Sequence, residues 1–545
     1  MSDAAPQAEP VLAEDVACLP APALRCAAFE LDLDPDQLGA LLRQPELLVP
    51  GTRRRVHAAR PLPLSLIWHD TPLGALAEDG IALAQRDRRP ASAAPRLAAD
   101  PQAWVRTALV ARPGAICPPG DATILRESLT GEVLAAEAVA ALPVPLLPVA
   151  AFEGSTRVLR AQAPRIEIVQ GDLRALTASR PVCRVLIEGE GAASLVVAWS
   201  ALLVATPALH SLAAEALMLS GRAVPSRPLG APQLNAEMDV SEAYAATIAH
   251  LAGVMAHHAG LATGQHGPEP VHQMRVALRR LRSAITLFRR AAMCPEIDAA
   301  LVLLKQLGGV LGPARDWDVF TTGLGRRVGA AFADEKAVTE LLAAAERKRQ
   351  ASYAALAQHL DSFAWRALLA SLAGLALTRP WETQGEAPGE THAPEDAARA
   401  ARQRELQATR LRPFAAHALS RRLRALLAPG EDLSGLPVAA LHDIRLCCKR
   451  LRYAAEFFAP AFPGRATRRF LSRLSDLQED LGQLNDGAVA AELMAQLDRS
   501  GARGAAERQL AIGMVRGFVA AGSVSARRRI ERDWRRLLRQ EGFWL

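Results

Sequence analysis

The 545-residue sequence predicts two regions of different fold class, an α+β region in which antiparallel strands dominate and then an all-α region. Up to about residue 220, short apolar stretches alternate with Gly, Pro and polar turns, as in strands joined by tight connections. From residue 236 onward, Ala/Leu/Arg segments with a 3.6-residue period run to the C-terminus, as in packed helices. A third observation, a repeat within the helical region, predicts that this region has two similar halves.

The N-terminal region is expected to begin with a disordered tail over residues 1–20 and to form a domain over residues 23–220. Its strand candidates include LPLSLIWHD, WVRTALVA, IEIVQ and CRVLIEGE. Helical patterns interrupt them at Pro35–Leu42 and near Trp199–Leu219. Runs of strands with few helices are typical of an α+β domain with an antiparallel sheet.

A Pro- and Gly-rich stretch over residues 221–235 is predicted to be a linker, and the helical region follows at 236–545. We expect halves at 236–378 and 400–545, joined by a polar connector at 379–399. Each half shows about four helical segments. They are predicted at 239–260, 270–293, 297–326 and 335–377, and at 400–428, 438–459, 465–498 and 503–539.

One uncharged run, Gly191–Leu209, is long enough to be considered as a membrane span. It is rich in Ala, Gly and Ser, contains Pro207 and lacks basic flanks, so a helix outside the membrane and no span are predicted. The N-terminus lacks the basic and apolar pattern of a secretory signal. The cysteines are scattered without a CxxC pair, which favours a reducing compartment. A cytoplasmic location is therefore expected.

The repeat consists of two motifs that recur at one fixed offset of 170 residues. VHQMRVALRRLRSAITLF, residues 271–288, aligns without gaps with LHDIRLCCKRLRYAAEFF, residues 441–458. LKQLGGVLGPARDWDVF, residues 304–320, aligns in the same way with LSDLQEDLGQLNDGAVA, residues 474–490. Two motifs at one offset indicate a duplicated helical unit.

Each copy of the first motif is predicted to present a basic stripe opposite an apolar face. On a helix, His272, Arg275, Arg279 and Arg282 fall within a sector of about 80°. The second copy repeats the layout. The predicted anion-binding residues are His272, Arg275, Arg279, Arg282, Lys305, His442, Arg445, Lys449 and Arg452, with Arg280, Arg450, Arg347 and Lys348 as additional candidates.

A functional anion site is favoured over an ordinary solvated face because the stripe has little local compensation. In the first copy no acidic residue stands four positions from any stripe residue; in the second, Glu456 follows Arg452 at that spacing. Residues 236–545 carry a net charge of +10 and residues 1–235 one of −3, so a polyanion is expected on the helical region. Arginine forks suit phosphate oxygens. His272 and His442 are equally compatible with phosphate contact and with hydrogen bonds to neighbouring helices.

The two copies resemble the signature helices of the CHAD domain, the conserved-histidine α-helical domain. LGPARDWDVF and LGQLNDGAVA resemble its following helices, and GFWL is similar to its usual end. The resemblance covers about residues 236–545. It implies two pseudo-symmetric four-helix bundles whose basic central surface binds inorganic polyphosphate, and recruitment to polyphosphate granules.

Residues 23–220 resemble the CYTH (triphosphate tunnel) family more weakly, through WHDTPLGALAEDGIALAQRD and AWVRTAL. This resemblance implies an antiparallel β tunnel or barrel-like domain. The family's ExExK positions, two metal-binding glutamates and a phosphate-binding lysine, align here with Cys26, Ala28 and Glu30. The RxR pair is reduced to Ala84 and Arg86. Too few ligands remain for a two-metal phosphohydrolase, so a catalytically inactive domain with no metal is expected.

The function predicted from the sequence is therefore non-catalytic binding of inorganic polyphosphate by the duplicated basic helices, without a cofactor. One alternative is a metal-dependent inorganic triphosphatase that works through the N-terminal domain with Mg²⁺ or Mn²⁺. The other is nucleic-acid binding by the basic helices. It is disfavoured because no aromatic residues interleave the basic stripe as a stacking platform.

Overall fold

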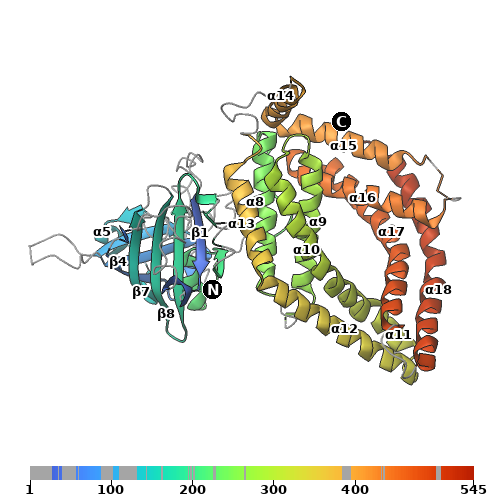
Figure 1. Cartoon of the computed structure of the whole chain (residues 1–545), viewed down its shortest axis with the longest axis horizontal. Helices are drawn as coiled ribbons and strands as arrows, with labels where there is room; N and C mark the ends of the chain where they lie inside the picture. Colours follow the sequence, from blue (N-terminus) through green and yellow to red (C-terminus); the bar gives the residue numbers. More distant parts are fainter. Residues whose placement is uncertain are drawn as a thin grey trace, which may run out of the picture.

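The computed structural model places a curved antiparallel sheet beside a large helical region (Figure 1). It describes residues 28–34, 36–39, 57–58, 60–87, 102–109, 132–140, 142, 144–160, 164–193, 195–196, 199, 203–224, 229–262, 266–382, 394–430, 432–433, 436–498 and 505–545. The predicted tail at 1–20 lies outside these ranges. Within them, the expectation of an α+β region followed by an all-α region is confirmed.

The N-terminal region forms one sheet in which every strand pair is antiparallel. The strands are β1 (Ala28–Leu33), β2 (His57–Ala58), β3 (Leu62–Asp70), β4 (Ile81–Asp87), β5 (Gln102–Ala108), β6 (Glu132–Leu134), β7 (Leu147–Arg160), β8 (Arg165–Ala175), β9 (Ser179–Glu188) and β10 (Ala205–Pro207). Their order is β10-β1-β9-β8-β7-β3-β4-β5-β6, with β2 on the end of β7. In the described part of the chain β10 and β6 are not paired, so the sheet does not close.

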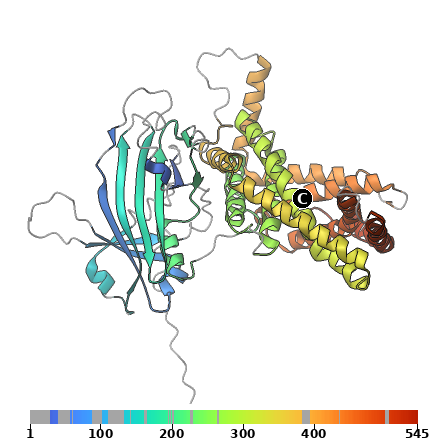
Figure 2. The ribbon, with the colours of Figure 1, turned by 60° about the horizontal axis from the view of Figure 1, so that its bottom comes forward.

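Alternation of side chains buries both faces of this sheet. On one face, Trp68 and Phe152 pack with helix α7 (Leu212–Leu219). On the other, Phe29 and Val185 pack with helix α13 (Phe363–Thr378) of the helical region. Figures 1 and 2 both place α13 between the sheet and the remaining helices. One helix therefore belongs to the core of both regions.

The preference for a helix throughout Gly191–Leu209 is wrong at its C-terminal end. Residues 205–207 form β10, which extends the sheet by pairing with β1, Leu31 opposite Pro207. The pairing partner lies more than 170 residues away in the sequence, so local periodicity carries no sign of it.

By length and apolar composition, the run Pro295–Ala331 reaches the threshold for a membrane span, and the bent pair Lys336–Leu360 and Phe363–Thr378 reaches it if counted together. Core helices of proteins without a membrane part meet the same criterion. Leu304, Leu307 and Leu311 of the first run are fully buried in the helical core. The absence of a span stays a prediction.

The helical region contains α8 (Val240–Ala259), α9 (Glu269–Phe288), α10 (Pro295–Val319), a π-helical turn (Phe320–Gly325), α11 (Arg326–Ala331), α12 (Lys336–Leu360), α13, α14 (Pro394–Ala408), α15 (Leu411–Leu427), α16 (Val438–Phe458), α17 (Arg465–Asp498) and α18 (Ala505–Leu538). Two segments predicted as single helices are broken. The break at Ser362 separates α12 from α13, and that at Arg410 separates α14 from α15. Both residues have extended backbones.

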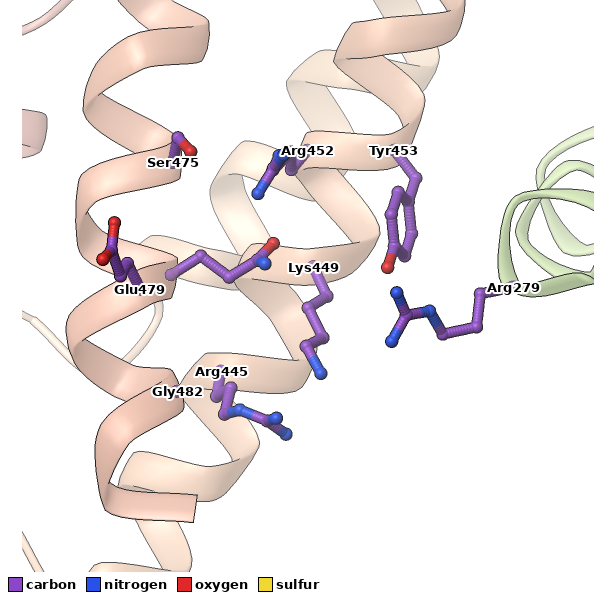
Figure 3. A pocket seen from close by; sticks show the side chains of 9 residues that line it. Arg279, Arg445, Lys449, Arg452, Tyr453, Ser475, Glu479 and Gly482 are labelled. Carbon is purple, nitrogen blue, oxygen red and sulfur yellow. The ribbon is translucent and has the colours of Figure 1, made fainter. Parts of the chain in front are cut away.

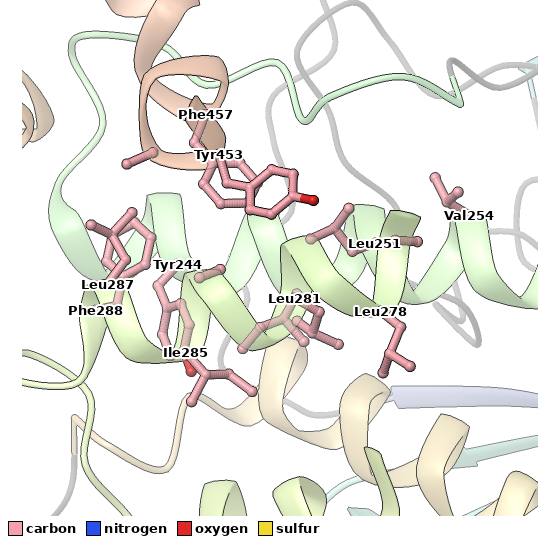
Figure 4. Close-up of a cluster of buried hydrophobic side chains, with 14 of the residues drawn as sticks. Tyr244, Leu251, Val254, Leu278, Leu281, Ile285, Leu287, Phe288, Tyr453 and Phe457 are labelled. Atoms are coloured by element: carbon pink, nitrogen blue, oxygen red, sulfur yellow. The ribbon is translucent and has the colours of Figure 1, made fainter. Parts of the chain in front are cut away.

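The apolar faces predicted for α9 and α16 are confirmed. Met274, Leu281 and Phe288 are fully buried on α9, and Ile444, Cys448 and Leu451 are buried on α16. Around α9, aromatic and aliphatic side chains from α8, α9 and α16 form one cluster (Figure 4). This packing fixes which face of each helix is left for its cations.

An approximate twofold relation between the halves is visible where duplicated residues meet. Phe288 contacts its own counterpart Phe458, with ring centroids 6.2 Å apart. The starts of α8 and α15 also meet: Val240 N donates to Thr409 O at 3.1 Å, and Leu411 N donates to Met238 O at 2.9 Å. A residue contacts its own counterpart only beside the symmetry axis, so the axis passes through these contacts.

The halves also meet at a second place, apart from the contacts beside this axis. Trp317, Phe320 and Leu341 of the first half share an apolar cluster with Leu493 and Ile512 of the second. This cluster, which we call the tip cluster, is separate from the main helical core. In Figure 1 the helices accordingly outline a triangle, with α12 and α18 meeting at one corner.

The boundaries predicted for the domains stay predictions, but parts of both predicted connecting stretches are packed. In the linker, Leu234 is buried in the helical core, and Gly230 O lies 3.0 Å from His250 Nε2. In the connector, Trp381 is buried and its Nε1 donates to Ser241 Oγ at 2.7 Å. The C-terminal end of the linker and the N-terminal end of the connector are therefore both packed against the helical region.

Candidate anion-binding site

A basic pocket of about 460 Å³ lies where α9 of the first half approaches α16 and α17 of the second. Its lining residues are Arg279, Arg445, Lys449, Arg452, Tyr453, Ser475, Gln478, Glu479 and Gly482. Figure 3 shows the Arg279 guanidinium reaching from α9 toward the Tyr453 hydroxyl on α16, with Lys449 beside it. Four cations and one carboxylate line the pocket, so it is suited to an anion.

Four of the predicted site residues, Arg279, Arg445, Lys449 and Arg452, line this pocket together. The others do not line it. Lys305, Arg282, His442, Arg450, Arg347 and Lys348 are exposed, and His272, Arg275 and Arg280 are half-buried. The pocket thus draws three cations from the second basic stripe and only one from the first.

Arg279 is a half-buried cation with little compensation. Its Nε is buried and has no hydrogen-bond partner in the described part of the chain. Burial lowers the pKa of Arg279, and the charges of Arg275, Arg280 and Arg452 lower it further, whereas Tyr453 opposes them. A guanidinium held among cations in this way favours binding of an anion.

The expectation that the first stripe is uncompensated is wrong for Arg275, because tertiary contacts supply what local spacing does not. Arg275 Nη2 donates to Asp316 Oδ1 of α10 at 3.3 Å. Burial raises the pKa of Asp316, while Arg275 opposes that rise. Because Arg275 is paired with Asp316, it is not one of the cations left unpaired for phosphate.

Glu456 of α16 neutralises cations from both halves. Its Oε2 accepts from Arg280 Nη2 and its Oε1 accepts from Arg452 Nε, each at 2.8 Å. The side chain is only 15% exposed. Because Nε of Arg452 is engaged, the two Nη groups of its guanidinium are left for the pocket.

His272 does not line the pocket, but the same cations act on it. Burial lowers its pKa; Arg315, Arg279 and Arg275 lower it further and Glu269 opposes them. The imidazole is therefore neutral near pH 7. Its counterpart His442 is exposed, so the two histidines occupy different environments despite their equivalent positions in the repeat.

A family model for the CHAD domain matches residues 245–495. This part of the chain is a CHAD domain. The resemblance predicted from the duplicated motifs is thereby confirmed for the helical region, and the CYTH resemblance of the N-terminal region stays a prediction.

Two solved structures resemble the CHAD region. The crystal structure of the CHAD domain from the plant Ricinus communis is 28% identical, covers 57% of this chain and 96% of its own, and has a TM-score of 0.46. PptA from Streptomyces chartreusis is 18% identical, covers 54% of this chain and 99% of its own, and has a TM-score of 0.39. No curated protein sequence matches the chain.

Sequence reasoning did not assign the pocket residues that carry no positive charge, Tyr453, Ser475, Gln478, Glu479 and Gly482. The repeat contained a signal for one of them. Ser475 is the counterpart, 170 residues on, of the predicted site residue Lys305. Tyr453 follows Arg452 directly but lies toward the apolar face of α16, where it is 9% exposed. Its role as a wall of the pocket depends on α9, which local sequence does not show.

The carboxylates of the N-terminal sheet do not fit the Mg²⁺ or Mn²⁺ that the CYTH resemblance implies. The buried guanidinium of Arg184 on β9 lies 2.9 Å from Glu30 Oε1, 2.9 Å from Asp32 Oδ1 and 2.7 Å from Glu215 Oε1 of α7. An internal cation thus already holds all three. Among the described residues no group of three or more His, Cys, Asp or Glu side chains is arranged to hold a metal ion. Of the aligned ExExK positions, Cys26 lies outside the described residues.

Proposed function

We propose that the CHAD domain binds inorganic polyphosphate in the basic pocket between α9, α16 and α17, and that the chain catalyses no reaction on it. The observation that carries this proposal is Arg279, a half-buried cation among cations whose Nε has no partner in the described part of the chain. Phosphate oxygens complement such a guanidinium through charge-assisted hydrogen bonds. We further propose a cytoplasmic protein that associates with polyphosphate granules.

Three features of the pocket favour a phosphate chain over a nucleic acid. Its cations are spaced along two helices, as a flexible polyanion requires. Its one aromatic residue, Tyr453, is buried against α8 and α9 rather than offered for base stacking (Figure 4). Finally, Ser475 and Gln478 add neutral polar groups able to donate hydrogen bonds to phosphate oxygens.

The proposal is tested by a polyphosphate-binding isotherm on the whole chain. The variant Arg279→Met with Lys449→Met removes two pocket cations, and the control Arg347→Met with Lys348→Met removes two exposed cations of α12. Each charge-assisted bond is worth about 1.5–3 kcal/mol, so we expect a loss of roughly 100-fold or more in the pocket variant. The control should lose only a few-fold. Equal losses in both would contradict the pocket assignment.

The triphosphatase alternative requires a metal site in the N-terminal region, and the engagement of Glu30, Asp32 and Glu215 by Arg184 argues against one. A phosphate-release assay on the whole chain with tripolyphosphate and Mg²⁺ or Mn²⁺ tests this point. We expect no turnover above a blank. Turnover that disappears in Glu30→Gln would establish the alternative and end the non-catalytic proposal.

A further inference from the structure

The two sides of the approximate twofold axis differ strongly in charge. The axis is fixed by the contact of Phe288 with its counterpart Phe458 and by the reciprocal bonds between the starts of α8 and α15. Beside the axis, residues of α9 have counterparts on α16 that lie 170 positions away, and the reciprocal bonds relate α8 to α15 at an offset of 171. Substitutions between the copies therefore show where the two sides have diverged.

The first side of the axis is neutral and mostly apolar. Arg280 of α9 is paired with Glu456 at 2.8 Å. Nearby, α8 contributes His250, Leu251 and Gly253, all buried. Figure 4 shows Leu251 and Val254 along the same face of α8, within the apolar cluster.

The second side carries more positive charge at the corresponding positions. The counterpart of Arg280 is Arg450 on α16, and the counterpart of Glu456 is Thr286, so the acid is missing. At the 171-residue offset of the reciprocal bonds, Arg421, Arg422 and Arg424 on α15 correspond to His250, Leu251 and Gly253 on α8. Four guanidinium groups thus stand where the first side has one, and we call them the α15 arginine cluster.

Arg422 is the member that packing holds in place. It is half-buried on the side of α15 that faces the core, between the buried residues Ala418 and Leu426. Its Nη1 donates to Ala418 O of its own helix at 3.3 Å. Burial, with Arg421 and Arg450 nearby, lowers the pKa of Arg422 to about 10.

In the described part of the chain no carboxylate is paired with any residue of the α15 arginine cluster. This differs from other arginines of the helical region: Arg349, for example, is paired with both Glu346 and Asp318. Like charges gathered without a counter-ion are unfavourable, and most so for a partly buried member. A bound anion relieves that cost.

We infer that α15 and α16 form a second anion site, built from Arg421, Arg422, Arg424 and Arg450, which binds phosphate groups of a polyphosphate chain. The identity of the polymer rests on the proposed function; the site itself does not. Arginine forks match phosphate oxygens in bidentate fashion. The exposed residues beside the cluster on α15, such as Ala425 and Ala428, provide no aromatic surface for base stacking.

The second site is separate from the pocket. Arg450 follows the pocket residue Lys449 directly, so it points about 100° away around α16. None of the four arginines lines the pocket. A short phosphate chain bound at one site therefore leaves the other available, and the two sites can be counted independently.

The test is a calorimetric titration of the whole chain with tripolyphosphate. The cluster variant carries Arg421→Gln, Arg424→Gln and Arg450→Gln and keeps the packed Arg422. Its control removes three exposed cations elsewhere, with Arg326→Gln, Arg347→Gln and Lys348→Gln. We expect two sites in the unmodified chain and in the control, and one in the cluster variant. With long-chain polyphosphate, the slope of log affinity against log salt should fall by about 0.7 for each lost contact.

The possible outcomes separate this inference from the proposed function. Two sites in the cluster variant would overturn the inference and leave the pocket standing. Conversely, if the pocket variant Arg279→Met with Lys449→Met keeps all binding and the cluster variant loses it, the pocket fails and the inference stands. Displacement of tripolyphosphate by RNA at lower concentration than by polyphosphate would also overturn the inference, because the ligand would then be a nucleic acid.

A second measurement needs no ligand. Replacing Arg422 by Leu removes the half-buried charge and keeps an apolar side chain in the helix, so the Tm of the ligand-free chain should rise. Saturating tripolyphosphate should raise the Tm of the unmodified chain more than that of Arg422→Leu. A fall in Tm of Arg422→Leu, with an unchanged ligand response, would show that Arg422 is already compensated within the fold and would contradict the second site.

Discussion

Arg184 in the sheet and Arg279 in the CHAD domain are both arginines with buried polar atoms, and they have opposite surroundings. Arg184 is fully buried and three carboxylates surround it. Arg279 is half-buried, and its pKa is lowered by burial and by the charges of other arginines around it. The first guanidinium is satisfied by the fold itself and stabilises it, whereas the second has binding capacity left for a ligand. Burial of a cation alone therefore does not identify a site; the charges around it do.

The largest effect on stability should come from removing Arg184, whose charge is paired with three carboxylates. Arg184→Met leaves Glu30 and Asp32 without their counter-ion between β1, β9 and α7, and leaves Glu215 with Arg180 alone. We expect this to cost about 3–5 kcal/mol in the free energy of unfolding. Chemical unfolding followed by far-UV circular dichroism measures it. The control Arg174→Met removes an arginine that is 54% exposed and paired with Glu153 and Asp172, and should cost about 0–1 kcal/mol. Similar costs for both variants would contradict the contrast.

The same substitution at Arg279 should weaken binding rather than stability. Arg279→Met removes an uncompensated cation, so thermal stability without ligand should be unchanged or higher, while the affinity for long-chain polyphosphate should fall roughly tenfold to hundredfold. Differential scanning calorimetry and a binding isotherm on one preparation give both values. Arg282→Met, one turn along the exposed side of α9, is the matched control. A marked loss of stability in Arg279→Met would show that its guanidinium is satisfied internally.

In the CHAD domain, as around Arg184 in the sheet, some charges are paired within the fold. The Glu456 carboxylate engages both Arg280 and Arg452. Glu456→Gln removes that negative charge beside the pocket. Polyphosphate affinity should rise about threefold to tenfold, and the free energy of unfolding should fall by about 1–3 kcal/mol because two hydrogen bonds to a charged acceptor are weakened. The variant Glu492→Gln, an exposed acid of α17, serves as control. Weaker binding in Glu456→Gln would mean that orientation of Arg452 outweighs the charge.

The smallest effect concerns pH and His272, whose pKa is lowered chiefly by burial. The unfolded chain binds this proton more readily, so the ligand-free protein loses stability as pH falls from about 6.5 through the lowered folded value. Bound phosphate favours the protonated form, so polyphosphate affinity should rise over the same interval by about twofold to fivefold. His272→Gln should flatten that part of the affinity profile. An identical profile in the variant would assign the pH dependence to another group.

Much of the fold was predictable because it depends on short-range periodicity. The buried positions of α9 and α16 follow directly from the 3.6-residue pattern, and α17 begins and ends at the predicted residues. What the pattern missed depends on distant partners. Residues 205–207 become a strand because β1 offers an edge. Similarly, Arg410 interrupts a helical pattern because the chain there bonds to the start of α8.

The candidate site divides in the same way. Arg445, Lys449 and Arg452 share one face of one helix, so helical geometry alone groups them. Their approach to Arg279 depends on how the halves pack, which the repeat suggested but did not specify. Asp316, which engages Arg275, comes from another helix, so a test confined to residues four positions apart overlooked it. The α15 arginine cluster was overlooked for a related reason, since its significance appears only when each residue is compared with its counterpart across the axis.

The tip cluster has a mechanical consequence. The two halves are attached near the twofold axis, through residues such as Phe288 and Phe458, and again at the tip through residues such as Trp317 and Leu493. Two bodies joined at a single point pivot freely, but two bodies joined at two separated points turn only about the line between them. The walls contributed by α9 and α16 are therefore braced against spreading, and a chain entering the pocket meets cations whose spacing is already set. Little conformational freedom remains to be lost on binding.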